Sequence, residues 1–321
     1  MSNLQPTRDV STLLRLQLSH DLAQSSLGLF GALPAQDHEI VGVGHDASAE
    51  TSLQPEHLLR KAAKPGIRRY RILDVPISII SIEQVLKLFA EDWMVDRRDR
   101  YIVFRDVHGV MRARSDTKLR RAHEASDLTA PDGMPLVWIA KFVGIDGVSR
   151  VCGPDSLPVV CERGVPLGWR HYFLGGAPAV AEALIRQLKQ KYPGILIVGS
   201  SSPPFRPLSV EEDEAICATI RGARPDFVWV GLGTPKQEVW MHEHRGRFGG
   251  VTLLGVGAAF DFHAGKTSRA PRWMQRSGLE WLHRLVQEPK RLYRRYLVLG
   301  PTFLLLAFIE VLEGRIAAEP I

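Results

Sequence analysis

Two apolar runs in the second half of the chain each end in glycines, and the polar residues behind those glycines have the types needed to bind a ligand. The runs lie in 226–238, DFVWVGLGTPKQE, and 251–265, VTLLGVGAAFDFHAG. After the first run, one turn supplies a hydroxyl, an ammonium, an amide and a carboxylate, from Thr234, Lys236, Gln237 and Glu238. Glycines there let a ligand approach the backbone, and the following helix offers free N–H groups, which suits a phosphorylated or sugar ligand. An ordinary tight strand-to-helix connection explains the same pattern, and both interpretations stay open.

A second candidate is the turn that carries Asp132, in Pro131-Asp132-Gly133 between an apolar segment and a helical pattern. A carboxylate held there could act as a general base toward a hydroxyl group. Aspartate in such a turn more often caps the helix or bonds its own backbone, so a structural role is the alternative. Nearby, Arg150 in RVCGPD is either a fork-shaped ligand for phosphate or a solvated surface group.

Gly175 and Gly176 follow another apolar run, in FLGGAP, where either a nucleotide approaches the backbone or the chain makes a plain tight turn. Other chemistries find little support. The histidines lack H-E-x-x-H spacing and the cysteines lack CxxC spacing, so no protein-built metal site and no cofactor are expected. A G-x-S-x-G elbow is missing, and no full G-x-G-x-x-G fingerprint marks a nucleotide-dependent oxidoreductase, which remains a disfavoured rival.

Alternating strand and helix patterns must position these residues. Predicted strands are 69–75, 101–104, 127–130, 171–174, 196–199 and 227–230. Predicted helices are 81–89, 108–126, 136–143, 179–192 and 210–221. The turn at 234–238 should begin with Thr234 as a cap and Pro235 at the first helical position. The alternation predicts an α/β fold, with a mostly parallel Rossmann-like sheet and helices on both faces.

Composition limits the possible partners and the cellular compartment of the protein. The chain has 321 residues, is 45% apolar and carries a net charge of +6, which permits anionic partners without indicating nucleic acid. Three scattered cysteines indicate a reducing cytoplasm, and no leader pattern is expected at the start. The uncharged stretch 296–309 is shorter than the roughly 20 residues of a membrane span, and Gly300-Pro301 is expected to interrupt it.

Six segments in order resemble the WecG/TagA/CpsF glycosyltransferases over roughly residues 70 to 313. They are APDGMPLVW at 130–138, RVCGPD at 150–155, FLGGAP at 173–178, GLGTPKQE at 231–238, GVGAAFDFHAG at 255–265 and APRWMQRSGLEWLHRL at 270–285. The resemblance implies an inverting, metal-independent transfer of a hexose or N-acetylhexosamine. Its donor would be a UDP-sugar and its acceptor a polyprenyl-diphosphate-linked sugar, in surface polysaccharide or exopolysaccharide biosynthesis.

The resemblance also implies roles for single residues. Asp132 becomes the base that takes the acceptor's proton, and Gln237 contacts the donor or an intermediate, with Thr234, Lys236 and Glu238 beside it. Arg150 becomes an acceptor or phosphate ligand, while Asp261 supports the pocket and Gly175 and Gly176 admit the donor. The basic residues of a C-terminal appendage that binds the diphosphate are Arg284, Arg291 and Arg294, whose spacing places them near one helical face.

The resemblance divides the chain into a flexible N-terminal extension (1–66), an α/β catalytic domain (67–268) and a membrane-associating helical appendage (269–321). Apolar and aromatic groups beside clustered cations would hold the appendage on the inner face of the cytoplasmic membrane, and a core helix with a dimer contact is the alternative. The family resemblance also admits a homo-oligomer.

One position departs from the family pattern. Where the family has Thr-x-Asn after the second strand, this chain has Phe104 and Asp106. An amide donates and accepts, whereas an ionised carboxylate only accepts and repels a diphosphate. The departure supports an alternative function, in which a catalytically impaired member is a scaffold for polysaccharide assembly.

Overall fold

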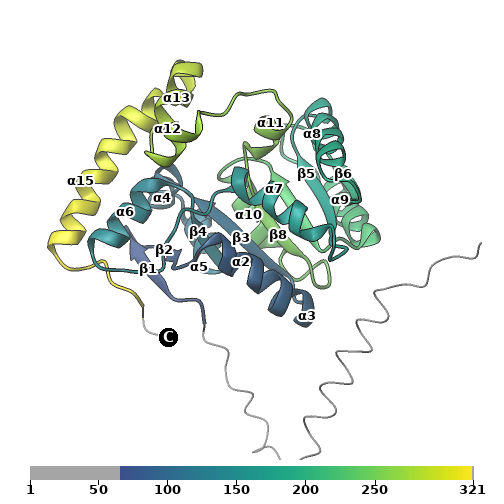
Figure 1. Cartoon of the computed structure of the whole chain (residues 1–321), viewed down its shortest axis with the longest axis horizontal. Coiled ribbons are helices and arrows are strands. Elements are labelled where there is room, and N and C mark those ends of the chain that lie inside the picture. Colours follow the sequence, from purple (N-terminus) through teal and green to yellow (C-terminus); the bar gives the residue numbers. More distant parts are fainter. Residues whose placement is uncertain (1–65, 320–321) are drawn as a thin grey trace, which may run out of the picture. The chain divides into compact units, whose positions relative to one another are not determined.

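A six-stranded parallel sheet forms the centre of the computed structural model, which describes residues 66–319 (Figure 1). The predicted N-terminal extension 1–66 lies outside the described residues except for Gly66. The strand order is β4-β3-β8-β7-β5-β6, and every neighbouring pair is parallel. The strands are β3 (Arg100–Arg105), β4 (Leu128–Pro131), β5 (Arg170–Gly175), β6 (Leu196–Ser201), β7 (Phe227–Gly231) and β8 (Thr252–Gly255). The predicted α/β class is confirmed.

Alternate side chains of each strand enter separate apolar cores on the two faces of the sheet. In β7, Phe227 and Trp229 point to one core and Val228 and Val230 to the other, as the two-residue period of a strand requires. The first face is covered by α2 (Ile82–Lys87), its π-helical continuation η1 (Leu88–Trp93), α3 (Met94–Asp96), α7 (Gly153–Gly164) and α8 (Pro178–Lys191). The second face is covered by α9 (Val210–Ala223) and α10 (Lys236–His244). Helices on both faces are therefore confirmed.

The predicted strand 69–75 is wrong, because the chain reverses within it. It forms an antiparallel hairpin, β1 (Arg69–Ile72) and β2 (Val75–Ser78), separate from the main sheet. Leu73 and Asp74 make the turn with positive φ angles of 48° and 65°. The Leu73 N–H donates to the Glu310 carboxylate at 2.8 Å, a contact with the far end of the chain that helps fix the turn and that no local pattern reveals.

The predicted helix 108–126 is two helices, α4 (Val107–Ala113) and α5 (Thr117–Glu124). Asp116 breaks the pattern because its carboxylate caps α5, accepting from the Leu119 N–H at 3.0 Å. In the same way, Asp106 caps α4 by accepting from the Gly109 N–H at 3.0 Å. The carboxylate of Asp106, the residue that departs from the family pattern, thus has a fixed orientation at the end of β3.

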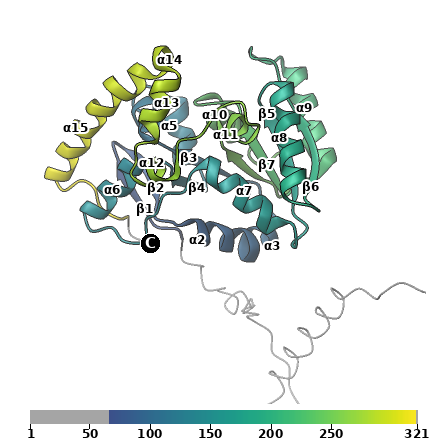
Figure 2. The ribbon, with the colours of Figure 1, turned by 45° about the horizontal axis from the view of Figure 1, so that its top comes forward.

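The C-terminal part, called the appendage below, consists of helices after residue 268. They are α12 (Arg272–Arg276), α13 (Glu280–Gln287), α14 (Pro289–Tyr293), the π-helical η2 (Arg294–Val298) and α15 (Leu299–Leu312). Phe303 and Ala307 of α15 pack against the hairpin and α6 (Met134–Phe142). Figures 1 and 2 show α15 beside α6, at the opposite end of the sheet from β6 and α9.

The expected interruption at Gly300-Pro301 is wrong. From Pro289 to Leu312 the chain is one helix of 24 residues, long and apolar enough by length and composition to cross a membrane. The turn before Pro301 is π-helical, and this wider turn accommodates a residue without an N–H group. Only 17% of its most apolar window is buried inside the protein.

Candidate active site

Two carboxylates lie side by side at the carboxyl edge of the sheet. Asp106 follows β3 and Asp132 follows the adjacent β4, whose Pro131 pairs in register with Arg105. The Asp132 N–H donates to the Arg105 carbonyl at 2.8 Å. Gly133 follows directly and packs beside Asp106, since a Cβ there would lie in ordinary contact, 3.4 Å from the Asp106 Cα. The parallel register thus brings together two acidic residues that are 26 positions apart in the sequence.

Asp132 has the environment of a general base. Its side chain is 27% exposed, and one Arg150 nitrogen lies 3.6 Å from its Oδ1. Burial raises the pKa of Asp132 to about 6; Arg150 opposes the shift, and the charges of Asp106, Glu280 and Asp155 add to it. A base works best when its pKa lies near the working pH, and above pH 6 this carboxylate is ready to accept a proton.

Arg150 connects the sheet edge to the appendage. Its Nε donates to the Asp132 carbonyl at 2.7 Å, and its Nη2 donates to Glu280 of α13 at 2.8 Å. A second arginine, Arg269, contacts the same Glu280 carboxylate at 3.2 Å. Arg150 therefore positions Asp132 through its backbone while Glu280 occupies part of its guanidinium.

The turn after β7 does not form the cap predicted for it. The helix α10 begins at Lys236, Pro235 is its N-cap residue after a cis Thr234-Pro235 bond, and no side chain caps the helix. Thr234 instead donates its hydroxyl to the Glu238 carboxylate at 2.9 Å. Glu238 also accepts from Arg105 at 2.6 Å, in an ion pair whose side chains are 0% and 1% exposed. Most of this cluster is thus directed into the protein, beneath the strand ends.

Gln237 lies beneath the glycines that follow β8. It is buried, and its Nε2 donates to the Gly255 carbonyl at 2.9 Å and to Glu238 at 3.1 Å. Its Oε1 has no hydrogen-bond partner among the described residues and points to Gly257, where an added Cβ would lie 3.6 Å away. Lys236, by contrast, is exposed to solvent. The amide therefore offers a free acceptor at the strand ends, and the lysine offers a mobile charge.

Gly175 and Gly176 have a structural reason to be glycine. Their φ angles are 117° and 69°, and a Cβ on Gly175 would lie 2.6 Å from the Gly231 carbonyl group. Adjacent strand ends approach so closely that a side chain does not fit. The glycines bring the ends of β5 and β7 together, and a role in admitting the donor stays a prediction.

Three of the predicted ligand-binding residues share a small pocket. Its volume is about 160 Å³, and it is formed by α11 (Ala259–His263), the following loop and the appendage. It is lined by Ala258, Asp261, Phe262, Lys266, Thr267, Arg284, Glu288 and Arg291. The Arg284 guanidinium lies 5.5 Å from the centre of the Phe262 ring. The pocket thus combines an aromatic face with cations from both parts of the protein.

The expectation that three arginines share one helical face is wrong. Arg284 lies in α13, and the helix breaks at Glu288 before Arg291 in α14. Arg291 pairs with Glu288 at 2.7 Å and lines the pocket, whereas Arg294 is exposed and is not among the lining residues. The proline at position 289 starts a new helix there, and the seven-residue spacing spans two helices.

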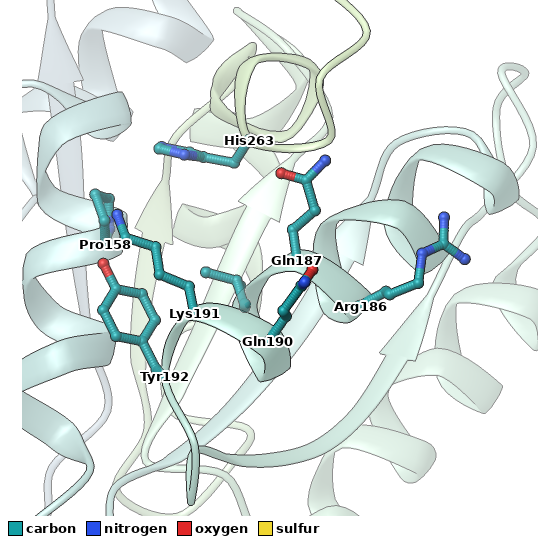
Figure 3. A pocket seen from close by; sticks show the side chains of 8 residues that line it. Pro158, Arg186, Gln187, Gln190, Lys191, Tyr192 and His263 are labelled. Atoms are coloured by element: carbon teal, nitrogen blue, oxygen red, sulfur yellow. The ribbon is translucent and has the colours of Figure 1, made fainter.

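A larger cavity of about 550 Å³ lies away from the paired carboxylates, between α7, α8 and α11 (Figure 3). It is lined by Pro158, Arg186, Gln187, Leu188, Gln190, Lys191, Tyr192 and His263. The Lys191 ammonium lies 5.1 Å from the centre of the Tyr192 ring, and His263 contacts the Pro154 carbonyl at 2.7 Å. In Figure 3, Arg186 points away from the other polar groups. None of the predicted site residues lines this cavity.

Three further residues, Asp213, Cys217 and His244, have possible metal-ligand atoms within 4.8 Å of one another. Most of these atoms already have hydrogen-bond partners within the protein. His244 contacts Asp213 at 2.6 Å and the Trp240 carbonyl at 2.7 Å, and the Trp240 ring N–H donates to Asp213 at 2.9 Å. The carboxylate and both ring nitrogens are therefore occupied. The group contains none of the predicted site residues.

Sequence reasoning missed the charged partners of the site residues. Glu280 and Arg269 enclose Arg150, Arg105 neutralises Glu238, and Arg295 of the appendage contacts Asp106 at 2.5 Å. The only available signal was that Glu280 lies within a family segment. Nothing in the local pattern distinguishes Arg295 from its neighbour Arg294.

Comparison with known proteins adds a family and two relatives. Residues 70–317 match the model of the glycosyl transferase WecG/TagA/CpsF family. An N-acetylglucosaminyldiphosphoundecaprenol N-acetyl-beta-D-mannosaminyltransferase of Bacillus spizizenii is 33% identical over 173 residues, which cover 54% of this chain and 65% of the relative. Its namesake from Bacillus subtilis strain 168 is 31% identical over 167 residues, covering 52% and 63%. The chain thus spans somewhat less than two thirds of the length of either relative.

Proposed function

The chain belongs to the glycosyl transferase WecG/TagA/CpsF family, and from that premise we propose that it transfers a sugar from a UDP-sugar to a polyprenyl-diphosphate-linked glycan acceptor. The names of the two relatives describe transfer of N-acetylmannosamine onto an undecaprenyl-diphosphate-linked N-acetylglucosamine. An N-acetylhexosamine is accordingly the first donor sugar to test. The product would serve surface polysaccharide or exopolysaccharide assembly.

The observation that carries the proposal is the placement of Asp132 at the carboxyl edge of the sheet with a pKa of about 6. In the proposed reaction, an acceptor hydroxyl attacks the anomeric carbon as the bond to the diphosphate breaks. The hydroxyl proton passes to the Asp132 carboxylate, and UDP leaves with the bonding electrons. Attack opposite to the leaving group inverts the anomeric centre. Arg150 orients the base through the Asp132 carbonyl.

The charge that develops on the departing diphosphate needs fixed positive groups. Arg284 and Arg291 line the 160 Å³ pocket beside Lys266 and are proposed to bind the diphosphate there. The ring of Phe262 and the carboxylate of Asp261 complete that pocket. Lys236, which is exposed next to the buried Gln237 amide, adds a further cation. The catalytic α/β region 67–268 and the appendage 269–321 would thus contribute opposite walls of one site.

We propose that the appendage lies on the cytoplasmic face of the membrane, where a lipid-linked acceptor is found. Apolar side chains along one side of the long C-terminal helix are exposed. They are Leu297, Leu304, Leu305, Phe308 and Leu312. Their spacing places them on one face of the helix, and Arg294 is exposed beside them, which is the composition of an interfacial helix.

The opposite face of the helix supports peripheral attachment in preference to a span. Phe303 and Ala307 are buried against the rest of the protein, and the carboxylate of Glu310 holds the Leu73 backbone. A helix that spans a bilayer alone exposes all its sides to lipid, and a carboxylate within it is costly. One side of α15 is thus committed to protein contacts and the other is available to a membrane surface.

The test is a UDP-release assay with UDP-N-acetylhexosamines and a short-chain lipid-diphosphate N-acetylglucosamine acceptor. Asp132→Asn should lower kcat by a factor of about 10² to 10⁴, the usual contribution of a general base, without loss of folding. The matched control is Asp146→Asn, which removes a carboxylate from an exposed loop. Full turnover in Asp132→Asn would overturn the proposed role.

A second candidate follows from Asp106, which stands where the family has an amide. A chain impaired in donor binding would be a scaffold that binds membranes and partners without turnover. The same assay separates the two functions: vesicle binding without acceptor-dependent UDP release, across a panel of UDP-sugars, would favour the scaffold.

A further inference from the structure

Arg295 reaches from the appendage to the carboxylate that departs from the family pattern. Its Nη2 lies 2.5 Å from Asp106 Oδ2, and the two side chains are 27% and 28% exposed. Its guanidinium also lies 5.4 Å from the centre of the Tyr296 ring, and that ring packs 5.9 Å from Trp281 of α13. Arg295 is distinct from Arg284 and Arg291, which line the proposed diphosphate pocket. Its buried Nε has no hydrogen-bond partner among the described residues.

Asp106 cannot easily turn its charge away from the site. Its Oδ1 accepts the Gly109 N–H at 3.0 Å as the cap of α4, and its backbone packs against Gly133. Burial is the largest single effect and disfavours its ionised form, but Arg295, His108, Arg105 and the Gly109 N–H together outweigh it, and the pKa of Asp106 lies well below its usual value. A negative charge is therefore fixed beside Asp132, at the carboxyl edge of the sheet.

The arrangement replaces one neutral amide with a pair of opposite charges contributed by two parts of the protein. We propose that Arg295 is a positioning residue that cancels the charge of Asp106, so that the site accepts an anionic donor only when the appendage is docked. The inference rests on the proposed function, which supplies the anionic donor. It assigns to the appendage a second task besides binding the diphosphate directly.

Two consequences follow from simple electrostatics. When the appendage moves away, Asp106 loses its ion pair with Arg295 and its charge repels an anionic donor. When Asp106 is replaced by asparagine, no charge needs to be cancelled, and Arg295 becomes dispensable for donor binding. The effects of the two residues must then be strongly non-additive, which a double-mutant cycle measures.

The first experiment measures the Kd of UDP, and separately of inorganic pyrophosphate, by calorimetry on the full chain. Arg295→Gln should weaken both by about tenfold, whereas Arg295→Lys, Asp106→Asn and the double variant Asp106→Asn/Arg295→Gln should stay within about threefold of wild type. The matched control is Arg276→Gln, which removes an exposed arginine of α12 that has no ion pair among the described residues.

The outcomes separate the inference from the proposed function. If Arg295→Gln binds both ligands as tightly as wild type does, the charge-cancelling role is wrong. If the double variant binds as weakly as Arg295→Gln alone, the role is also wrong, and Arg295 contacts the ligand itself. If wild type binds pyrophosphate but not UDP, the proposed donor is wrong and the pyrophosphate series alone decides the inference. If wild type binds neither ligand, the inference is overturned.

A second experiment tests the docking step by trypsin cleavage after Lys290, Arg291 or Arg294, which are present in every variant, followed by mass spectrometry. Arg295→Gln should be cleaved faster than Arg276→Gln without any ligand, because an appendage contact is lost. By linkage, saturating UDP should slow cleavage of wild type at least threefold and slow cleavage of Asp106→Asn less. Equal protection by UDP in wild type and Asp106→Asn would show that docking and donor binding are not coupled through this pair.

Discussion

In the sheet, every residue of β3 is buried, and so are four of the five residues of β7; in the appendage, α13 buries none of its residues and α15 buries three. The ion pairs of the two regions differ in the same way. Arg105 and Glu238 are sealed beneath the strand ends, whereas Arg150 and Glu280, which join the sheet edge to the appendage, keep contact with solvent. The sheet therefore depends on contacts that cannot open without unfolding, while the appendage is held by contacts that water can replace.

Removing one partner from each kind of ion pair is the most direct test of this difference between the sheet and the appendage. Glu238→Ala leaves the Arg105 charge buried without a counter-charge, and the free energy of unfolding should fall by about 3–5 kcal/mol. Glu280→Ala leaves Arg150 in contact with Asp132 and solvent, and should cost about 1 kcal/mol or less.

Urea denaturation followed by tryptophan fluorescence measures both values, and Trp281→Phe versions of the two variants isolate the signal of the appendage from that of the other six tryptophans. Equal losses in the two variants would mean that the appendage is as integral to the fold as the strands are. A separate early transition of Trp281 in Glu280→Ala would support independent opening.

Asp132 provides the next test, because its raised pKa lowers the stability of the folded protein at neutral pH. Its pKa is raised from 3.8 to about 6, so the folded state binds a proton that the unfolded state has already lost between those values. Wild type therefore carries a penalty that is absent below about pH 4 and complete above pH 6, of at most about 3 kcal/mol. Asp132→Asn should be more stable than wild type at pH 7.5 and show little gain at pH 4, as measured by urea unfolding at both pH values.

The sequence predicts the sheet edge better than it predicts the appendage, for a physical reason. Apolar runs followed by glycine or aspartate mark most of the strand ends, so most strands of the sheet and the positions of Asp132 and Gln237 follow from local patterns. The ion pairs Arg105–Glu238, Arg150–Glu280 and Asp106–Arg295 join residues 133, 130 and 189 positions apart, and no periodicity encodes such distances. The hairpin turn at Leu73 was missed for the same reason, since Glu310 holds it from the other end of the chain.

A smaller effect is expected from the exposed face of α15. Leu305 and Phe308 are 61% and 56% exposed, and burying such side chains in a membrane surface is favourable. Leu305→Ser/Phe308→Ser should weaken sedimentation with phosphatidylglycerol-containing vesicles by about tenfold or more and leave the unfolding midpoint unchanged. The matched control is Phe205→Ser/Val210→Ser, which changes two apolar residues that are more than 80% exposed near α9, at the far end of the sheet. A similar loss in the control would remove the special role of α15.

The smallest expected effect links the two regions through the base itself. The Glu280 carboxylate raises the pKa of Asp132 and shares the Arg150 guanidinium, so Glu280→Gln should lower that pKa from about 6 and leave Arg150 to act on Asp132 alone. In the proposed reaction the ionised carboxylate accepts the proton, and the acid limb of the profile of kcat/KM against pH should therefore move down by about half a unit. The ratio of activity at pH 5.5 to that at pH 7.5 isolates this shift from any general loss caused by weaker docking, and Arg276→Gln should leave the ratio unchanged. An acid limb that does not move in Glu280→Gln would mean that the appendage docks on the sheet edge without tuning its base.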